Sequence, residues 1–344
     1  MPGALQRPAV VSRVSDLIGY TPLLEFAATE TGSRLLLKLE MFNPTGTAKI
    51  RMARQMITDA EDRGELRPGG RIIESTSGNT GLGLAVVAAE RGYTFTAVVD
   101  HHASADKLRA MKAMGTELVY VDDDGGSSEE LATAAREELA EEMARGQDNT
   151  IFTEQHNNPS NGVGYFPVAH ELHEALDGRL DVLVGAVGTG GGLCGTAREL
   201  RTLIPDVTTI GVEPKGSIAF GGPAHDYYQS GTGTPEGAEI GALVDFGLID
   251  EGVKVGDVEA FATCRAVART GLLIGGSAGG VVHEALTRLA ALPPGTTMVA
   301  LVNDGGEKYL DTVFNDDWMH ARELLAPATE REIDELLTKL RRNR

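Results

Sequence analysis

The sequence has few cysteines and a shortage of positive charge, and each shortage excludes a class of function. Only Cys194 and Cys264 occur in 344 residues, too few for a disulfide framework, and this indicates a reducing compartment such as the cytoplasm. The chain has 31 lysine and arginine residues against 50 aspartate and glutamate residues, a net charge of −19. Nucleic acid and anionic membrane surfaces both need a basic face, so neither is expected as a partner. Long apolar runs are also missing, so we expect neither a membrane span nor a signal peptide.

The pattern that is present predicts an α/β protein. Strands and helices alternate along the chain, which is typical of parallel sheets covered by helices on both faces. The predicted strands are 35–40, 71–74, 93–99, 118–121, 150–152, 182–187, 208–212 and 298–302. The predicted helices are 48–63, 82–91, 105–114, 129–145, one ending near 176, 193–203, 258–269, 279–289 and a tail from about 318. Residues 215–248 are glycine-rich and irregular, and loops of this length are often functional.

One loop leads into a predicted helix and places a lysine in the first turn of that helix. It reads Asn43-Pro44-Thr45-Gly46-Thr47-Ala48-Lys49. Thr47 is predicted to be the N-cap of the helix. The helix macrodipole is positive at this end, so it disfavours an ammonium and should lower the pKa of Lys49. A lysine with a lowered pKa is a better nucleophile. Taken alone, the position also fits an ordinary solvated lysine.

A second loop has the composition of an anion site. It follows the predicted strand 182–187, opens the next helix, and consists of Gly188, Thr189, Gly190, Gly191 and Gly192. Backbone N–H groups and the helix dipole at such a turn favour a phosphate or a carboxylate.

The same stretch also fits a dinucleotide fingerprint. Gly190, Gly192 and Gly195 have G-x-G-x-x-G spacing, and Glu213 follows at about the right distance for a ribose hydroxyl. An NAD-dependent dehydrogenase is therefore the alternative from another class. A glycine-rich turn used only for close packing is a third interpretation.

Two further helix starts carry polar side chains. The loop Thr76-Ser77-Gly78-Asn79-Thr80 offers hydroxyls, backbone donors and an amide for a carboxylate, or serves as a plain capping loop. Ser277 stands in a Gly-Gly-Ser-Ala-Gly-Gly turn and by itself fits an N-cap. The pair His101-His102 lacks cysteines or carboxylates at ligand spacing, so no metal is expected.

Together these stretches closely resemble the fold-type II pyridoxal-phosphate enzymes, specifically the cysteine synthase and cystathionine β-synthase family. The resemblance extends from about Leu17 to Met319 and follows the family's order. The matching residues are Asn43-Pro44-Thr45-Gly46-Thr47-Ala48-Lys49, Thr76-Ser77-Gly78-Asn79-Thr80-Gly81, Gly188-Thr189-Gly190-Gly191-Gly192 and Gly276-Ser277-Ala278-Gly279.

The resemblance implies a role for each of these stretches toward pyridoxal 5′-phosphate. Lys49 would form the Schiff base, Asn79 would bind the phenolic oxygen, and Ser277 would face the pyridine nitrogen. The 188–192 loop would hold the phosphate. The substrate carboxylate would be bound by Thr76, Ser77, Gly78, Asn79 and Thr80, together with Gln155.

The resemblance also implies the architecture and the partners. We expect a large cofactor-binding domain made of 14–49 and 156–320, a small mobile domain at 50–155, and a helical tail at 321–344. The sheets would be parallel or mixed. The expected partners are an amino-acid substrate and a nucleophilic co-substrate, and the expected assembly is a homodimer.

The implied reaction is β-replacement on an L-serine derivative (O-acetyl-L-serine, O-phospho-L-serine or L-serine) through an aminoacrylate intermediate. A serine hydroxyl at 277 cannot hold the pyridine nitrogen protonated as a carboxylate would, so it weakens the electron sink and favours loss of a good β leaving group over transamination. Alternatives within the class are an L-cysteine desulfhydrase and a synthase of a 2,3-diaminopropionate-type precursor.

Some residues depart from the family's pattern. Ile50 stands between Lys49 and Arg51, where an acidic residue is usual, and Gly192 replaces a more usual threonine. His156, Tyr227, Tyr228 and Gln229 lie where the family usually shapes substrate choice, and they match neither branch of the family.

Overall fold

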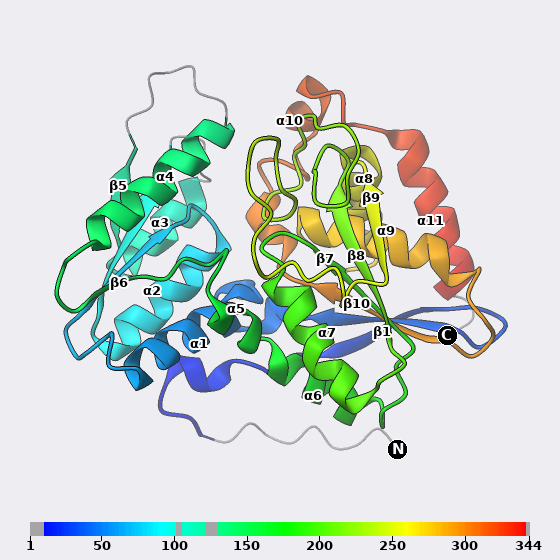
Figure 1. Ribbon diagram of the computed structural model, residues 1–344. Coiled ribbons are helices and arrows are strands. Elements are labelled where there is room, and N and C mark those ends of the chain that lie inside the picture. Colours follow the sequence, from blue (N-terminus) through cyan, green and yellow to red (C-terminus); the bar gives the residue numbers. More distant parts are fainter. Residues whose placement is uncertain (1–9, 101–104, 122–128, 342–344) are drawn as a thin grey trace.

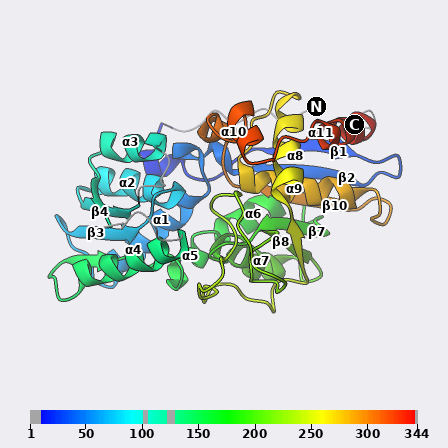
Figure 2. The ribbon, with the colours of Figure 1, turned by 90° about the horizontal axis from the view of Figure 1, so that it is seen from above.

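The chain forms two lobes, each built around one sheet. The computed structural model describes residues 10–100, 105–121 and 129–341, and the lobes lie side by side in both views (Figures 1 and 2). One sheet has six strands and the other four. Strands and helices alternate because successive parallel strands need a crossover connection, here usually a helix. The predicted α/β fold is confirmed.

The larger sheet has the strand order β1-β2-β10-β7-β8-β9. These strands are β1 (Leu23–Ala28), β2 (Arg34–Leu39), β10 (Thr297–Val302), β7 (Val182–Ala186), β8 (Thr208–Pro214) and β9 (Glu251–Val255). β1 runs antiparallel to β2, and the other neighbours are parallel. One face is covered by α8 (Asp257–Ala268), α9 (Gly276–Leu289) and α11 (Pro327–Arg341), and the other by α6 (Phe166–Ala175) and α7 (Gly191–Leu203) (Figure 2). Because both faces are covered, all six residues of β10 are buried.

The smaller sheet has the order β5-β4-β3-β6 and is parallel throughout. Its strands are β5 (Glu117–Tyr120), β4 (Thr94–Val99), β3 (Arg71–Ser75) and β6 (Thr150–Phe152). The helices of this lobe are α1 (Lys49–Asp62), α2 (Asn79–Arg91), α3 (Ala105–Ala113) and α4 (Glu129–Ala144), and the short α5 (Pro159–Val163) packs between α1 and α7. All four strands fall within the predicted small domain 50–155, although its boundaries stay a prediction.

A buried cluster of charged side chains fixes the start of α1. The Arg51 guanidinium is 1% exposed and lies 2.6 Å from Glu40 and 2.8 Å from Glu171. Lys38 on β2 donates to Glu171 at 2.6 Å. Every charge therefore has a partner, and removing one partner of such a group typically costs about 3–5 kcal/mol. Through Glu40, directly after β2, and Glu171 of α6, Arg51 anchors the start of α1. It thereby holds Lys49, two residues earlier, in place.

The structure corrects several predicted boundaries. β1 and β9 were not predicted: β1 makes the sheet mixed, and β9 follows the long irregular segment. The helix predicted to end near 176 is two helices, α5 and α6. Three helices start earlier than predicted, at Asn79, Gly191 and Gly276, so many of the predicted site residues lie in first helical turns.

One predicted cap is wrong, and the interpretation of Ser277 as an N-cap is excluded. The N-cap of α1 is Ala48, not Thr47, and the N-cap of α9 is Gly275, so Ser277 is not a cap. The tail packs on the body of the protein, where Arg265 and Arg269 pair with Glu330 of α11 at 2.8 and 3.0 Å. No helix in residues 10–100, 105–121 and 129–341 has the length and apolar character needed to span a membrane.

Candidate active site

The predicted site residues gather where strands end. β2, β3, β7 and β10 are followed by the Lys49 loop, the 76–80 loop, the 188–192 loop and the segment 303–305, respectively. In open α/β sheets, ligands bind outside the carboxyl ends of the strands. The candidate site therefore lies at the edge that this fold class uses for binding.

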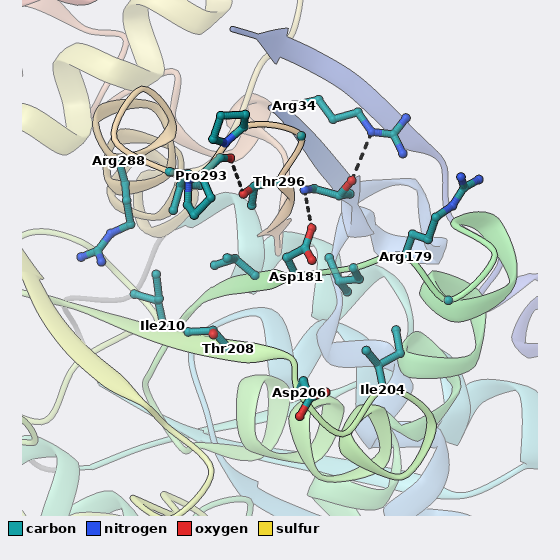
Figure 3. A pocket seen from close by; sticks show the side chains of 17 residues that line it. Arg34, Arg179, Asp181, Ile204, Asp206, Thr208, Ile210, Arg288, Pro293 and Thr296 are labelled. Atoms are coloured by element: carbon teal, nitrogen blue, oxygen red, sulfur yellow. Dashed lines mark hydrogen bonds between the residues drawn. The ribbon is translucent and has the colours of Figure 1, made fainter. Parts of the chain in front are cut away.

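A different hollow opens at the opposite edge. An open groove of about 1070 Å³ is lined by Arg34, Asp181, Thr208 and Thr297, which begin or precede their strands (Figure 3). None of the predicted site residues lines it. Arg288, one of the arginines that line the groove, already forms ion pairs with Glu251 and Glu284. The groove therefore contributes nothing to the candidate site.

Lys49 is the first residue of α1 and is partly buried. Its N–H donates to Thr47 Oγ1 at 3.2 Å. Thr45 and Gly46 have φ values of 67° and 65°, and this pair of left-handed residues turns the chain sharply into the helix. Burial lowers the pKa of Lys49 to about 8, while the charge on Glu74 opposes the shift. The direction agrees with the predicted lowering of the Lys49 pKa, and burial is its main cause.

The segment 303–305 joins three of the predicted stretches. The Ala48 N–H donates to the Asn303 carbonyl at 2.8 Å, and the Gly275 N–H donates to the Asp304 carbonyl at 3.1 Å. Asn79 Nδ2 donates to Asp304 Oδ2 at 2.8 Å. The Lys49 loop, the start of α2 and the turn before Ser277 are thus tied to one short segment.

Asp304 itself is a site residue that the sequence reasoning missed. It is 1% exposed and also accepts a hydrogen bond from the Tyr309 hydroxyl at 2.7 Å. The signal was available: a carboxylate comes two residues after the end of the apolar strand β10 and precedes two glycines.

The 76–80 loop is linked to Gln155 and, through a second missed residue, to the glycine loop. Thr80 Oγ1 donates to Gln155 Oε1 at 2.7 Å, and Thr76 Oγ1 accepts the N–H groups of Gly78 and Gly81. Asn161 Nδ2 donates to the Gln155 carbonyl at 2.7 Å and to Thr189 Oγ1 at 3.3 Å. The predicted carboxylate and phosphate loops therefore belong to one hydrogen-bonded network.

The glycine loop is shaped by the absence of side chains. Gly190 has φ 86°, and a Cβ there would lie 2.5 Å from the carbonyl of Leu243. A Cβ at Gly191 would lie 2.1 Å from Asn161 Oδ1. The long 215–248 segment packs on this loop, since Thr232 and Gly233 both donate to the Val187 carbonyl. The loop presents backbone N–H groups at the start of α7, as an anion site requires.

The dinucleotide interpretation fails on two residues. Glu213 is fully buried and accepts hydrogen bonds from the N–H groups of Ala219 and Phe220 and from Lys254, so it has no capacity left for a ribose. A Cβ at Gly195 would lie 2.3 Å from the Gly162 carbonyl. Gly195 thus serves the close packing of α7 on α5.

Other residues named from the sequence have partners of their own. His156 pairs with Glu137 at 2.9 Å, and Tyr228 packs edge-on against Trp318. Gln229 donates to the Val255 carbonyl at 2.9 Å. In the part of the chain that the structure describes, no three His, Cys, Asp or Glu side chains form a group that could hold a metal. The pair His101-His102 lies outside the described residues.

A buried carboxyl on β3 is a further missed feature. Glu74 is 1% exposed and accepts a hydrogen bond from the Thr153 hydroxyl. Burial raises the pKa of Glu74 to about 7, and the hydrogen bond from Thr153 opposes the shift. Glu74 lies on β3 two residues before the 76–80 loop, and its charge raises the pKa of Lys49.

Comparison with known proteins identifies the family. The family model for "Pyridoxal-phosphate dependent enzyme" matches residues 14–304. The chain belongs to this family. It is an enzyme, and its cofactor is pyridoxal 5′-phosphate.

Relatives of this pyridoxal-phosphate enzyme span nearly its whole length. It is 48% identical over 322 residues to a protein of Sinorhizobium fredii named "Putative cysteine synthase", covering 93% of this chain and 96% of that one. It is 35% identical to the O-acetylserine dependent cystathionine beta-synthase of Bacillus subtilis, with 88% and 96% covered. The crystal structure of a hydrogen sulfide-producing enzyme from Fusobacterium nucleatum matches with a TM-score of 0.81 and 33% identity, covering 88% of this chain and 100% of that one.

The residues present in this pyridoxal-phosphate enzyme fit the cofactor. The site offers an amine at Lys49, an anion cradle at 188–192, and the 6% exposed hydroxyl of Ser277. Three buried acceptors, Asn79 Oδ1, Asn161 Oδ1 and Asp304 Oδ1, have no partner among the described residues. Leaving a buried acceptor unpaired costs about 1–3 kcal/mol, so a ligand with donor groups, such as an amino acid with its ammonium, would be stabilised here.

Proposed function

We propose that the protein replaces the β-substituent of an activated L-serine by sulfide, as a cysteine synthase does. The relatives named cysteine synthase and O-acetylserine dependent cystathionine beta-synthase support β-replacement on serine derivatives. The observation that carries the proposal is the pairing of the 76–80 loop with Gln155, in contact with Asp304 and so with the Lys49 loop. This arrangement supports a binding site for an amino-acid carboxylate near the amine of Lys49.

Each stretch then has a role toward the cofactor. Lys49 Nζ would hold its aldehyde carbon, and the N–H groups of 188–192 would hold its phosphate. Asn79 would donate to its phenolic oxygen with the Nδ2 proton that is not bonded to Asp304. Ser277 would form a neutral hydrogen bond with the pyridine nitrogen.

The chain's own groups carry out the proton transfer and the orientation. When bound, pyridoxal phosphate supplies the electron sink for bond breaking at the substrate. Thr76, Ser77 and Thr80, with Gln155, fix the substrate carboxylate, and this orients the Cα–H bond toward Lys49. Lys49 Nζ, as the free amine, takes the α-proton as a general base, and burial favours that form by lowering its pKa to about 8. The neutral Ser277 hydroxyl keeps the sink weak, so the departure of a good β leaving group is favoured over transamination.

A panel of donors and nucleophiles tests the proposal. O-acetyl-L-serine, O-phospho-L-serine, L-serine and L-cysteine are each combined with sulfide, homocysteine or an amine, and products are read by mass spectrometry. We expect L-cysteine from an activated serine and sulfide, and no product from Lys49→Ala. Turnover with homocysteine or an amine but not sulfide would replace the proposal by another β-replacement. Release of sulfide from L-cysteine alone would make the protein a desulfhydrase.

We also propose that residues 50–155 move toward the rest of the chain when substrate binds. The support is that this part reaches the other lobe through the hydrogen bond from Asn79 to Asp304. Such closure would exclude water from the reaction. Crystal structures with and without substrate should differ in the position of this lobe, and identical positions would remove the claim.

Finally, we propose a cytoplasmic homodimer. Large apolar side chains near the start of the described chain are exposed, among them Val14, Leu17, Tyr20 and Phe42, and exposed apolar groups of this kind often mark an interface. The two cysteines are unpaired, as in a reducing compartment. Sedimentation at micromolar concentration tests the dimer, and cell fractionation tests the location.

A further inference from the structure

One residue of the glycine loop has room that its neighbours lack. An added Cβ at Gly188 would lie 3.1 Å from the Gly231 carbonyl, and those at Gly190 and Gly191 would lie 2.5 and 2.1 Å from their nearest atoms. At Gly192 the nearest atom, in the ring of Tyr165, is 3.8 Å away. Gly192 also does not have a positive φ. Crowding therefore requires glycine at positions 190 and 191 but not at 192.

The side chain that borders this space is Tyr165. It comes from the N-cap position of α6, which packs along α7 (Figure 1). Tyr165 is 4% exposed, and its hydroxyl makes no hydrogen bond with any of the residues that the structure describes. The hydroxyl oxygen is not among the fully enclosed polar atoms of the structure, so a ligand can reach it. Burial, with the charge of Glu40 adding to it, raises the pKa of Tyr165, so the phenol stays protonated and can donate.

Among the described residues, the glycine loop borders Tyr165 at Gly192, and this loop has the composition of an anion site. Its N–H groups at the start of α7 suit an anion, and an anion oxygen is an acceptor for a phenol. Gly192 leaves the path from the ring to the loop open, where a threonine or any larger residue would fill it. An anion bound to the loop would therefore be the acceptor that the Tyr165 hydroxyl lacks. The absence of a side chain at Gly192 would allow the two to meet.

We propose that the Tyr165 hydroxyl is a ligand of the cofactor's phosphate and that it acts through the space left at Gly192. The proposal rests on the proposed role of the 188–192 loop as the phosphate site. Tyr165 then supplies, from a neighbouring helix, the hydroxyl that Gly192 lacks. Hydrogen bonds to charged groups are the stronger ones, so the loss of this one should be visible in cofactor affinity.

Tyr165→Phe tests this, because it removes only the hydroxyl. The apoprotein is titrated with pyridoxal 5′-phosphate and, separately, with pyridoxal, which has no phosphate. We expect the variant to bind pyridoxal phosphate about tenfold more weakly and pyridoxal as the wild type does. The matched control is Tyr93→Phe, which removes the hydrogen bond from Tyr93 to Glu61 (2.6 Å) in the other lobe and should leave both affinities unchanged.

A second variant places a hydroxyl on the loop. In Tyr165→Phe/Gly192→Thr, the threonine should restore affinity for pyridoxal phosphate to within about threefold of wild type, and the ³¹P resonance of the bound cofactor should shift in the single variant and return in the double one. The proposal is overturned if Tyr165→Phe binds pyridoxal phosphate like the wild type, or if both ligands weaken equally. A wild-type protein that binds no pyridoxal phosphate would instead refute the role of the loop.

Discussion

The two strand-to-helix loops of the site are built by opposite means. The 188–192 loop, between β7 and α7, is defined by what it excludes: no Cβ fits at Gly190 or Gly191. The 76–80 loop, between β3 and α2, is defined by its side chains, which bond to Gln155 and Asp304. Around Gly78 there is no atom within 4 Å of an added Cβ.

The difference teaches how one site can hold a cofactor firmly and still admit a substrate. A loop whose shape is set by backbone crowding has one conformation, because packed interiors resist even one added methyl group. A loop held by a few hydrogen bonds can exchange them for bonds to a ligand at little net cost. We therefore expect the glycine loop to be intolerant of substitution and the 76–80 loop to respond in graded steps.

The strongest test of this difference between the loops adds one methyl group to each. Gly191→Ala should lower the affinity for pyridoxal phosphate by roughly 5- to 150-fold, since overpacking of this kind costs about 1–3 kcal/mol and displaces the loop. Gly78→Ala should leave that affinity within about twofold and raise the KM for the amino acid instead. Fluorescence titration and steady-state kinetics measure the two effects. Equal losses of cofactor affinity would show that both loops are equally crowded.

The next effect concerns the link between the loops and Asp304. Asp304→Ala removes the acceptor of Asn79 Nδ2 and should lower kcat/KM for the amino-acid donor by about tenfold, because a hydrogen bond to a charged group is worth about 1.5–3 kcal/mol. Tyr309→Phe is the matched control. It removes the other hydrogen bond to the same Asp304 oxygen and leaves Asn79 held, so its loss should be smaller. A larger loss in the tyrosine variant would contradict the role given to Asn79.

A pH experiment probes the lysine between the two loops. Cofactor uptake by the apoprotein needs the free amine of Lys49, whose pKa burial lowers to about 8. The uptake rate should therefore rise with pH and level off above about 8, well below the ordinary lysine value. The charge on Glu74 raises the Lys49 pKa, so Glu74→Gln should move the midpoint to lower pH. Stopped-flow absorbance gives the profile, and a midpoint near 10, or one that moves upward in the variant, would exclude this account.

The sequence indicates the candidate residues of the site more readily than the residues that hold them in place. Lys49, the 76–80 loop and the glycine loop stand in local patterns of strand, turn and helix, and such patterns can be read from neighbouring residues. Asp304, Asn161 and Glu74 were missed because each acts through partners distant in sequence, such as Asn79 for Asp304.

In the six-stranded sheet, β1 and β9 were missed while the four strands between them were found. Central strands are buried on both faces and form continuous apolar runs. The two missed strands lie at the edges of the sheet, where the apolar pattern is weaker.

The smallest effect should come from the single bond that joins the 76–80 loop to Gln155. Thr80→Val keeps the shape of the side chain and removes the hydrogen bond to Gln155 Oε1. Thr80 is 3% exposed, so the bond is sheltered from water, and losing a neutral hydrogen bond costs about 0.5–1.5 kcal/mol. We expect the KM for the amino-acid donor to rise about threefold, with kcat and cofactor affinity nearly unchanged, because Gln155 stays tied to Asn161 through its carbonyl. Thr76→Val is the contrasting variant: Thr76 Oγ1 accepts two backbone N–H groups inside the loop, and its loss should distort the loop and raise KM further. Steady-state kinetics on both variants decide the matter, and a Thr80→Val enzyme that loses cofactor would mean that the two loops are one rigid unit after all.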